Sequence, residues 1–325
     1  MSRRVLIVGG AGYIGAHCAR ELEEHGIEVV VYDNLSTGHR EAVRSELIAG
    51  DIRDREALRR TFEARRFDAV MHFAAKALVG ESVQHPLRYF DVNVGGTATL
   101  LSEMRRAEVE SFVFSSTCAV YGAPDYLPLD EDHPKRPVSP YGESKLMVEQ
   151  ILDAVREREG IRVASLRYFN ASGAHPDGSM GESHDPETHL IPLALQARLG
   201  LRGPLSLFGR DYDTRDGTCI RDYIHVCDLA VAHRLALASL WDGNRGRAWN
   251  LGTGTGTTVL EVLESIERIT GKAVPYVDAP RREGDPPGLY AAAQQVKADL
   301  GWSPKRDSID QIVSDAWTWI QNARY

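Results

Sequence analysis

Cysteine is scarce in this sequence of 325 residues, and long apolar runs are absent. Cys18, Cys118, Cys219 and Cys227 show neither disulfide-like nor metal-binding spacing, so we expect reduced thiols, no metal site and a cytoplasmic protein. No apolar run reaches the roughly 18 residues of a membrane span. The start, "MSRRVLIVGG", has an apolar run of only Val5–Val8, so we expect neither a signal peptide nor a membrane anchor.

Excess positive charge is also lacking. The chain has 38 Lys and Arg against 46 Asp and Glu, a net charge of −8, and no Lys/Arg block. This balance argues against a nucleic-acid partner. Hydrophobic residues make up 43% and charged residues 26%, which is typical of a globular protein with a sizeable core. The length predicts one large domain or two ordinary ones.

Short apolar segments alternate with segments of helical period in the first half of the chain. This rhythm predicts an α/β fold with a doubly wound, parallel, Rossmann-type sheet and right-handed crossovers. The expected strands cover 4–8, 28–32, 68–73, 111–116 and 161–166, and the expected helices cover 15–26, 55–66, 93–107 and 142–160.

The pattern changes near residue 170. Residues 171–220 are rich in Gly, Pro, Asp and His, and 173–187 lack periodicity, so we expect loop there. Regular structure is expected again as helices over 223–240, 259–270 and 308–323 and a strand over 248–252, with Thr257 or Thr258 as a helix N-cap. We therefore expect one domain over 1–170 and a smaller, mixed α/β domain over 171–325. A strand and a helix from about 222–252 are expected to return to the first sheet.

Three glycines, Gly9, Gly12 and Gly15, follow the first strand and open the first helix. This spacing is a variant of the dinucleotide fingerprint, in which glycines allow a tight turn and a close approach of the pyrophosphate to the helix N-terminus. Asp33 ends the second strand 18 residues after Gly15, where a carboxylate can bind a ribose diol and repel a 2′-phosphate. The pattern predicts NAD rather than NADP, and residues 1–170 as its domain.

Two further strand ends are candidate cofactor contacts. Asp51 and Ile52 end a further strand, which finishes in "AGDI" and lies between the strands at 28–32 and 68–73. There they could meet the adenine, although an ordinary turn also fits. Phe73, Ala74 and Ala75 end the fourth strand, and their mostly small side chains leave room for a ligand or simply pack.

Tyr141 and Lys145 stand four residues apart and therefore share one face of an expected helix. A nearby ammonium lowers the pKa of a phenol, which then can accept a proton from an alcohol. Such spacing also occurs by chance. Ser115, Ser116 and Thr117 close the fifth strand at the carboxyl edge of the sheet, where ligands bind in such folds, although turns also use hydroxyls there.

The motifs together resemble the UDP-galactose (UDP-glucose) 4-epimerases of the extended short-chain dehydrogenase/reductase family. The resemblance runs over nearly the whole chain, through "GGAGYIG", "DNLSTG", "GDIRD", "HFAAKALVGESV", "FSSTCAVYG", "SPYGESKLMVEQIL", "LRYFNASGAHPDG", "DGTCIRDYIHVCDLA", "NLGTG" and "RREGDPP". It implies catalysis by Thr117, Tyr141 and Lys145. Tyr141 would take the proton of the sugar O4–H while hydride passes from C4 to bound NAD. The 4-keto sugar would then turn over and receive the hydride on its other face.

The resemblance also implies binding residues for the cofactor and for a UDP-sugar. For NAD it adds Tyr13, Ile14, Asn34, Asp51, Ile52, Ala74, Asn93 and Phe169, besides Tyr141 and Lys145, and it assigns no role to Lys76. For the UDP-sugar it implies Thr117, Tyr141, Asn170, His189, Leu190, Phe208, Arg221, Tyr223, Arg282, Asp285 and Leu289. Many members have Asn where His189 stands.

Several alternatives stay open. Leu289 replaces a bulky tyrosine of some members, so UDP-N-acetylhexosamines could fit, and "SSTCA" also resembles UDP-pentose epimerases acting on UDP-xylose and UDP-arabinose. A 4,6-dehydratase would need an acid and a base after Thr117, where Cys118 and Ala119 stand. A nucleotide-sugar decarboxylase and a non-catalytic NAD-binding scaffold are further alternatives. The resemblance implies a homodimer formed through the helices in 93–107 and 142–157.

Overall fold

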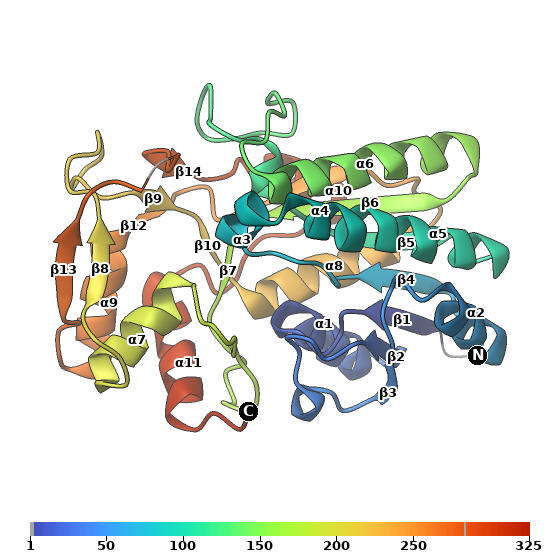
Figure 1. The fold of residues 1–325 in the computed structure, drawn as a ribbon, viewed down its shortest axis with the longest axis horizontal. Helices are drawn as coiled ribbons and strands as arrows, with labels where there is room; N and C mark the ends of the chain where they lie inside the picture. Colours follow the sequence, from blue (N-terminus) through green and yellow to red (C-terminus); the bar gives the residue numbers. More distant parts are fainter. Residues whose placement is uncertain (1–2, 283) are drawn as a thin grey trace.

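A seven-stranded parallel sheet forms the centre of the computed structural model, which describes residues 3–282 and 284–325 (Figure 1). The strand order is β11-β6-β5-β4-β1-β2-β3, so the chain winds outward from β1 to β3 and then outward again from β4 to β6. This topology confirms the predicted doubly wound α/β fold. The strands are β1 (Arg4–Val8), β2 (Glu28–Asp33), β3 (Glu46–Ala49), β4 (Ala69–His72), β5 (Ser111–Thr117), β6 (Arg162–Tyr168) and β11 (Ala248–Leu251).

Helices cover both faces of this sheet, which explains why its strands read as continuous apolar runs. In β1, Val5 and Ile7 point to one core, whereas Leu6 and Val8 point to the other, and all four are fully buried. One core packs against α1 (Tyr13–Glu24) and α8 (Val226–Trp241) (Figure 1). The other packs against α2 (Arg55–Ala64), α5 (Gly96–Arg106) and α6 (Pro140–Arg158).

A buried ion pair joins α6 to the sheet. Arg167 of β6 donates from Nη2 to Oε2 of Glu149 at 2.6 Å and from Nε to Oε1 at 2.9 Å, and the two side chains are 3% and 6% exposed. Ser116 Oγ donates to the same carboxylate at 2.6 Å, and Arg167 also donates to the Tyr121 hydroxyl at 2.8 Å. Because removing one partner of such a pair costs about 3–5 kcal/mol, this network holds α6 in a defined place over β5 and β6.

The C-terminal part has a core of its own, built by three helices and a two-stranded parallel sheet. The helices are α7 (Leu190–Leu199), α9 (Val259–Thr270) and α11 (Ile309–Gln321), and the strands are β8 (Leu205–Phe208) and β13 (Tyr276–Ala279). The smaller elements are β7 (Asn170–Ser172), β9 (Ile220–Arg221), β10 (Tyr223–His225), β12 (Thr257–Thr258), β14 (Gly288–Leu289), α3 (Val79–Gln84), α4 (Pro86–Tyr89) and α10 (Gln294–Leu300).

Thr258 is the N-cap of α9, as predicted. Its hydroxyl accepts the backbone N–H of Glu261 at 3.1 Å, and the Glu261 side chain accepts the N–H of Thr258 at 2.9 Å. This reciprocal pair of bonds is a capping box, which satisfies two backbone donors that the helix itself leaves free.

Two predictions for the second half were wrong. Tyr223–His225 form strand β10 beside β7, and the helix begins only at Val226, where His225 Nδ1 accepts the N–H of Cys227. The stretch 188–222, for which no helix or strand was expected, contains α7 and β8, whereas 173–187 is loop as predicted. Strand β10 depends on a partner 53 residues away in the chain, and α7 is apolar on most sides, so neither has a local periodic signal.

The segment expected to return to the first sheet lies against it. Strand β11 pairs with β6 in parallel, and α8 covers the same face as α1. The domain boundary near residue 170 stays a prediction. Across residues 3–282 and 284–325, every helix is too short or too polar to cross a bilayer.

Candidate active site

The three glycines of the fingerprint, Gly9 and Gly12 in the loop between β1 and α1 and Gly15 in α1, serve two different purposes. Gly9 has φ +81°, and a Cβ there would lie 2.3 Å from the Ala74 nitrogen; a Cβ on Gly15 would lie 2.3 Å from the Gly9 oxygen. These two glycines are therefore required by the protein's own packing. A Cβ on Gly12 would meet only the Gly9 oxygen, at an ordinary 3.6 Å. Gly12 stands at the N-cap of α1, so the space before it suits an anion such as a pyrophosphate.

Asp33 ends β2 beside this loop and is 8% exposed. Its Oδ2 accepts the N–H of Ala11 at 2.9 Å, and its Oδ1 accepts the N–H of Leu35 at 2.8 Å. The two amides stabilise the negative charge and aim the carboxylate, and each oxygen keeps a lone pair for a ribose hydroxyl. A 2′-phosphate would be repelled, which favours NAD over NADP.

Asn34 and Asp51 lie together next to Asp33. Asn34 Nδ2 donates to Asp51 Oδ2 at 3.1 Å, and Arg53 Nη2 donates to the same oxygen at 2.8 Å. Hydrogen bonds from Arg53 hold the pKa of Asp51 well below its usual range. Ile52 is buried against Gly96, where a Cβ would lie 2.5 Å from its Cδ1. The structure therefore places three of the predicted NAD-binding residues at one edge of the sheet.

Asn93 clamps the end of β4 to α6. Its Oδ1 accepts the N–H of Lys76 at 2.8 Å, and its Nδ2 donates to the Lys76 carbonyl at 3.0 Å and to Ser144 Oγ at 2.9 Å. Asn93 is 2% exposed, and both amide hydrogens are used within the protein. Its contacts thus position the segment that contains Phe73, Ala74 and Ala75, and direct cofactor contact stays a prediction.

The first turn of α6 packs very closely on the loop that follows β5. Ser139 caps the helix by accepting the N–H of Gly142 at 3.2 Å, and Pro140 occupies its first position. A Cβ on Gly142 would lie 2.6 Å from the Ala119 oxygen. This approach brings the hydroxyl of Tyr141 near that of Thr117.

Lys145 turns toward β5. Its Nζ donates to the Ser115 carbonyl at 2.8 Å and lies 4.7 Å from the centre of the Phe114 ring. The side chain is 3% exposed. Thr117, Tyr141 and Lys145 are therefore gathered at the carboxyl end of β5, as the sequence predicted.

Burial has the largest effect on the pKa values of Tyr141 and Lys145. It raises the pKa of Tyr141 to about 12, against the opposing effect of the hydrogen bond with Thr117. It lowers the pKa of Lys145 to about 7, although the charge of Glu149 opposes this. The expected lowering of the Tyr141 pKa by Lys145 is not found in the protein alone, because the ammonium is bonded to Ser115 and both groups are desolvated.

Five of the predicted substrate residues gather on the C-terminal part. Arg221 Nη2 lies 3.3 Å from Asp285 Oδ1, and Arg282 Nε lies 3.5 Å from Asp285 Oδ2. The Arg282 guanidinium stacks 4.7 Å over the Phe208 ring. Leu289 stands opposite Arg221 in the parallel pair of β14 and β9. Two cations, a carboxylate and an aromatic face thus meet, which is a set that suits a nucleoside diphosphate.

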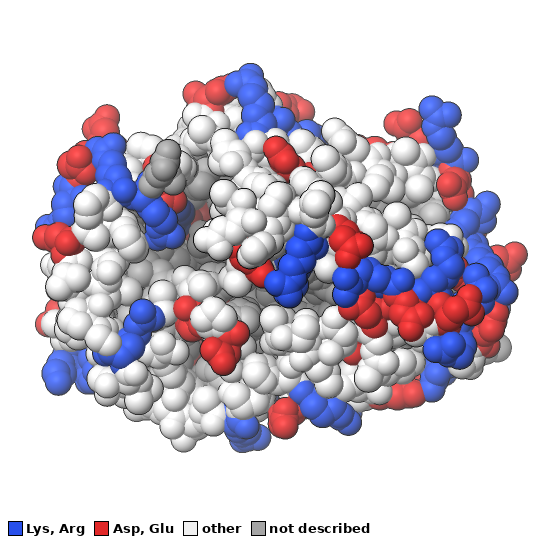
Figure 2. Space-filling model, viewed as in Figure 1, with Lys and Arg blue, Asp and Glu red and all other residues white. Residues whose placement is uncertain are grey.

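A small apolar cluster connects this group to the catalytic strand end. Leu289 and Phe169 pack with Cys118, the neighbour of Thr117, around the fully buried Val120 and Tyr121. The surface is hollowed between the part that holds the sheet and the part that holds α7 and β8 (Figure 2). Charges of both signs alternate over this face.

Four other predicted substrate residues have different surroundings. Asn170 opens β7, and its N–H donates to the Asp222 carbonyl at 2.9 Å. Tyr223 is only 6% exposed and packs in the core of the C-terminal part. His189, followed by Leu190, lies at the N-terminus of α7 and is bonded to Glu182. Substrate contact by these residues stays a prediction.

Comparisons with known proteins agree with this arrangement. The NAD dependent epimerase/dehydratase family matches residues 5–252. This chain belongs to that family.

Its relatives match over almost the whole chain. It is 47% identical over 320 residues to the UDP-glucose 4-epimerase of Lacticaseibacillus casei, covering 98% of this chain and 97% of the relative. The crystal structure of the UDP-glucose 4-epimerase from Brucella ovis in complex with NAD matches with a TM-score of 0.95 and 48% identity, over 98% and 99% of the two chains. The UDP-glucose-4-epimerase from Stenotrophomonas maltophila with bound NAD and formylated UDP-arabinopyranose matches with a TM-score of 0.95 and 41% identity, over 98% of both.

Membership of this epimerase/dehydratase family confirms the predicted resemblance and makes NAD the cofactor. The residues fit NAD, because Gly12 leaves open space at the N-terminus of α1 and Asp33 is aimed beside it. Sequence reasoning missed Glu149 and Arg167, which hold α6 in place, and it missed Glu182, His184 and Glu187 around His189. The spacing E-x-H-x-x-E-x-H from Glu182 to His189 was a usable signal for the second group.

Gly12→Ala tests the different purposes of the glycines. The added methyl enters the space for the pyrophosphate, so NAD affinity should fall by about 1–3 kcal/mol, or roughly 5- to 150-fold. Calorimetric titration of NAD into the stripped protein measures this. The melting temperature of that stripped protein should be unchanged. Gly15→Ala is the matched control, because its methyl meets the protein's own backbone and should lower the melting temperature. Unchanged NAD affinity in Gly12→Ala would contradict the assignment.

Proposed function

We propose that this chain interconverts UDP-galactose and UDP-glucose by inverting C4 of the hexose through a 4-keto intermediate. The observation that supports this most is the convergence of Tyr141, Thr117 and the buried Lys145 at the carboxyl edge of a sheet in an NAD-dependent family. The high identity to UDP-glucose 4-epimerases over the full length supports the same reaction.

Tyr141 is the proposed base. When bound, NAD accepts a hydride from C4 of the sugar and returns it, which is chemistry that no side chain supplies. Tyr141 takes the proton from the sugar O4 and later gives it back, and the Thr117 hydroxyl holds the same oxygen. A phenol with a pKa near 12 needs a nearby cation to act at neutral pH. Lys145 supplies this charge when its ammonium turns from the Ser115 carbonyl toward Tyr141.

The diphosphate is held by the two arginines of the C-terminal part. Arg221 and Arg282 present fork-shaped donors that match phosphate oxygens, and both already face Asp285. Asp285 keeps acceptor capacity for a ribose hydroxyl. Phe208 offers a flat apolar face beside Arg282, on which the uracil ring of the UDP-sugar can stack. Binding at the diphosphate leaves the hexose free to turn over about that link.

Tyr141→Phe removes only the hydroxyl and tests the base. Turnover of UDP-galactose should fall by about 10²–10⁴, which is the usual contribution of a positioned acid or base. The rate of UDP-glucose formation measures this, and the retained NAD and the melting temperature should match the parent. Tyr276→Phe is the matched control, since Tyr276 is 41% exposed on β13. Full activity in Tyr141→Phe would exclude the proposed mechanism.

The choice of sugar depends on the pocket wall at Leu289. A leucine there is smaller than tyrosine and leaves room for an N-acetyl group, so we propose that UDP-N-acetylglucosamine is also a substrate. UDP-pentoses are a second candidate class, which the Stenotrophomonas maltophila relative with its bound UDP-arabinopyranose derivative favours.

Leu289→Tyr tests this wall. The larger ring should clash with the N-acetyl group, so turnover of UDP-N-acetylglucosamine relative to UDP-galactose should fall by roughly 5- to 150-fold, which corresponds to an overpacking cost of about 1–3 kcal/mol. Product analysis with both sugars measures the ratio. Leu201→Tyr, at a position 71% exposed, should leave the ratio unchanged. Refusal of UDP-N-acetylglucosamine by the active parent protein would count against the proposal.

The rival activities have weaker support. A 4,6-dehydratase requires an acid and a base after Thr117, and Cys118 and Ala119 cannot serve. Burial raises the pKa of the Cys118 thiol to about 12, so it is a poor acid as well. A non-catalytic scaffold would not need Tyr141 and Lys145 in this arrangement, and a decarboxylase shares them without explaining the close epimerase relatives.

A homodimer is the proposed assembly, and the cytoplasm is the proposed location. Apolar side chains are exposed on the adjoining helices α3, α4 and α6: Val79, Val83, Leu87 and Met147 are 50%, 62%, 80% and 41% exposed. Such a contiguous face is typical of a contact between copies of a chain. All four cysteines are free, which suits a reducing compartment, and cell fractionation checks this.

Leu87→Asp tests the dimer. Burying a carboxylate in an apolar contact is costly, so the variant should sediment as a monomer at concentrations where the parent sediments as a dimer. Val277→Asp, on β13 and 53% exposed, should leave the dimer intact. A parent protein that is monomeric throughout would refute the proposed assembly.

A further inference from the structure

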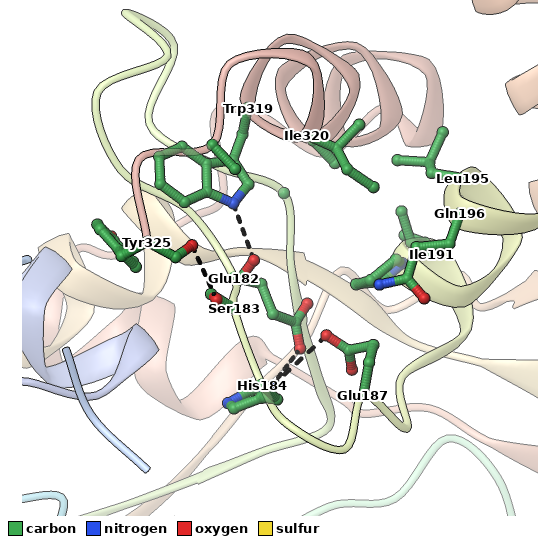
Figure 3. Close-up of a pocket in the computed structure, with 14 residues that line it drawn as sticks. Glu182, Ser183, His184, Glu187, Ile191, Leu195, Gln196, Trp319, Ile320 and Tyr325 are labelled. Atoms are coloured by element: carbon green, nitrogen blue, oxygen red, sulfur yellow. Dashed lines mark hydrogen bonds and ion pairs between the residues drawn. The ribbon is translucent and has the colours of Figure 1, made fainter. Parts of the chain in front are cut away.

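Four side chains of one short segment converge beside α7. Glu182, His184, Glu187 and His189 each offer one ligand atom, and these atoms all lie within 4.8 Å of one another. His184 Nδ1 is 3.2 Å from Glu182 Oε1 and 3.8 Å from Glu187 Oε2, and His189 Nδ1 is 3.7 Å from Glu187 Oε1. His189 Nδ1 also contacts Glu182 Oε1. Glu182 and Glu187 point toward His184 in Figure 3.

The two carboxylates of this cluster are desolvated. The side chains of Glu182 and Glu187 are 5% and 7% exposed, whereas those of His184 and His189 are 29% and 53% exposed. Among residues 3–282 and 284–325, the ion-pair partners of both carboxylates are these two histidines alone. Two buried negative charges need compensation, which either two imidazolium protons or one divalent cation can provide.

Protons compensate these charges in the protein by itself. Burial would lower the pKa of His184, but hydrogen bonds to Glu182 and Glu187 outweigh it and raise the pKa to about 10. The pKa of His189 is raised as well, chiefly by its bond to Glu182, which also outweighs burial. A cation that binds here must therefore displace protons from the imidazoles.

The donor set and its spacing match zinc. Two imidazole nitrogens and two carboxylate oxygens are preferred ligands of Zn²⁺, whose bonds of about 2.0–2.2 Å put tetrahedral ligands roughly 3.4 Å apart. The ligand atoms here already lie close to that spacing, so small rotations of the side chains would be enough to place all four around one ion. Four protein ligands from one segment correspond to a closed, structural site rather than an open, catalytic one.

The surroundings fix the ligands in place. Glu187 Oε1 accepts the N–H groups of Thr188 at 2.7 Å and of His189 at 2.9 Å, which leaves Oε2 toward His184. Trp319 Nε1 of α11 donates to the Glu182 carbonyl at 2.8 Å (Figure 3). Such outer bonds orient ligands in established metal sites. A cavity of about 130 Å³ adjoins the cluster and offers an entry path.

We propose that Glu182, His184, Glu187 and His189 bind one Zn²⁺ as a structural site that pins the segment leading into α7. The same segment approaches the cofactor helix, because the Tyr13 ring lies edge-on to His184 at 6.4 Å and the Tyr13 hydroxyl donates to the Gly173 carbonyl at 2.6 Å. The ion thus ties the start of α7 and the start of α1 to one loop. Binding exchanges up to two imidazole protons for one Zn²⁺, which leaves the charge of the site neutral.

Calorimetric titration of ZnCl₂ into the full chain tests the site, after dialysis against EDTA and without a nucleotide sugar. We expect one Zn²⁺ per chain. Co²⁺ at the same stoichiometry should give the intense visible bands of a tetrahedral complex. Zn²⁺ should also raise the melting temperature.

Variants locate the ion. Glu182→Gln, which removes the shared carboxylate, and His189→Asn, which alters a half-exposed ligand, should each weaken Zn²⁺ binding at least about tenfold. His25→Asn is the matched control, since His25 is 46% exposed beside Glu21 and lies outside the cluster. If Glu182→Gln fails to fold, His189→Asn decides. No saturable Zn²⁺ binding by the parent, or equal affinity in His189→Asn and the parent, would each overturn the proposal.

Discussion

The buried ion pair between Arg167 and Glu149 is the contact on which the candidate site depends. Helix α6 carries both Tyr141 and Lys145, and a shift of one turn would remove them from the end of β5. Two desolvated charges cannot separate without a large cost, so they allow only one position of α6 against β5 and β6. Ser116 joins the same carboxylate and stands next to Thr117, which gives the three proposed catalytic residues a common support.

Burial gives this site its unusual electrostatics. The same desolvation that raises the pKa of Tyr141 lowers that of Lys145, because burial disfavours the charged form of each group. A site in this condition needs further charge or a rearrangement of Lys145 before the phenol can act as a base. Substrate and cofactor binding therefore belong to the catalytic arrangement, rather than only delivering reactants to it.

The C-terminal part contains groups of two kinds. An apolar cluster joins Leu289 and Phe169 to the strand end, whereas charged groups gather around Asp285 and around Glu182. We propose that the first kind shapes the sugar pocket. The second is proposed to supply cations for a diphosphate at one place and buried carboxylates for a metal at another. Segments with little periodicity thus contain many of the proposed binding residues, because a loop can position polar side chains without the regular backbone hydrogen bonding of a sheet or helix.

The sequence by itself determined the central sheet, the glycine loop and the gathering of Thr117, Tyr141 and Lys145. Apolar runs, helical periodicity and short sequence spacings carry that information. Parallel strands also bring their carboxyl ends to one edge of the sheet, whatever the conformation of the connecting loops. Only the tertiary structure decided the strand at Tyr223, the contacts of Asn93, the direction of Lys145 and the cluster around His189. Each depends on partners distant in sequence or on burial, and neither pairing nor desolvation leaves a local pattern in the chain.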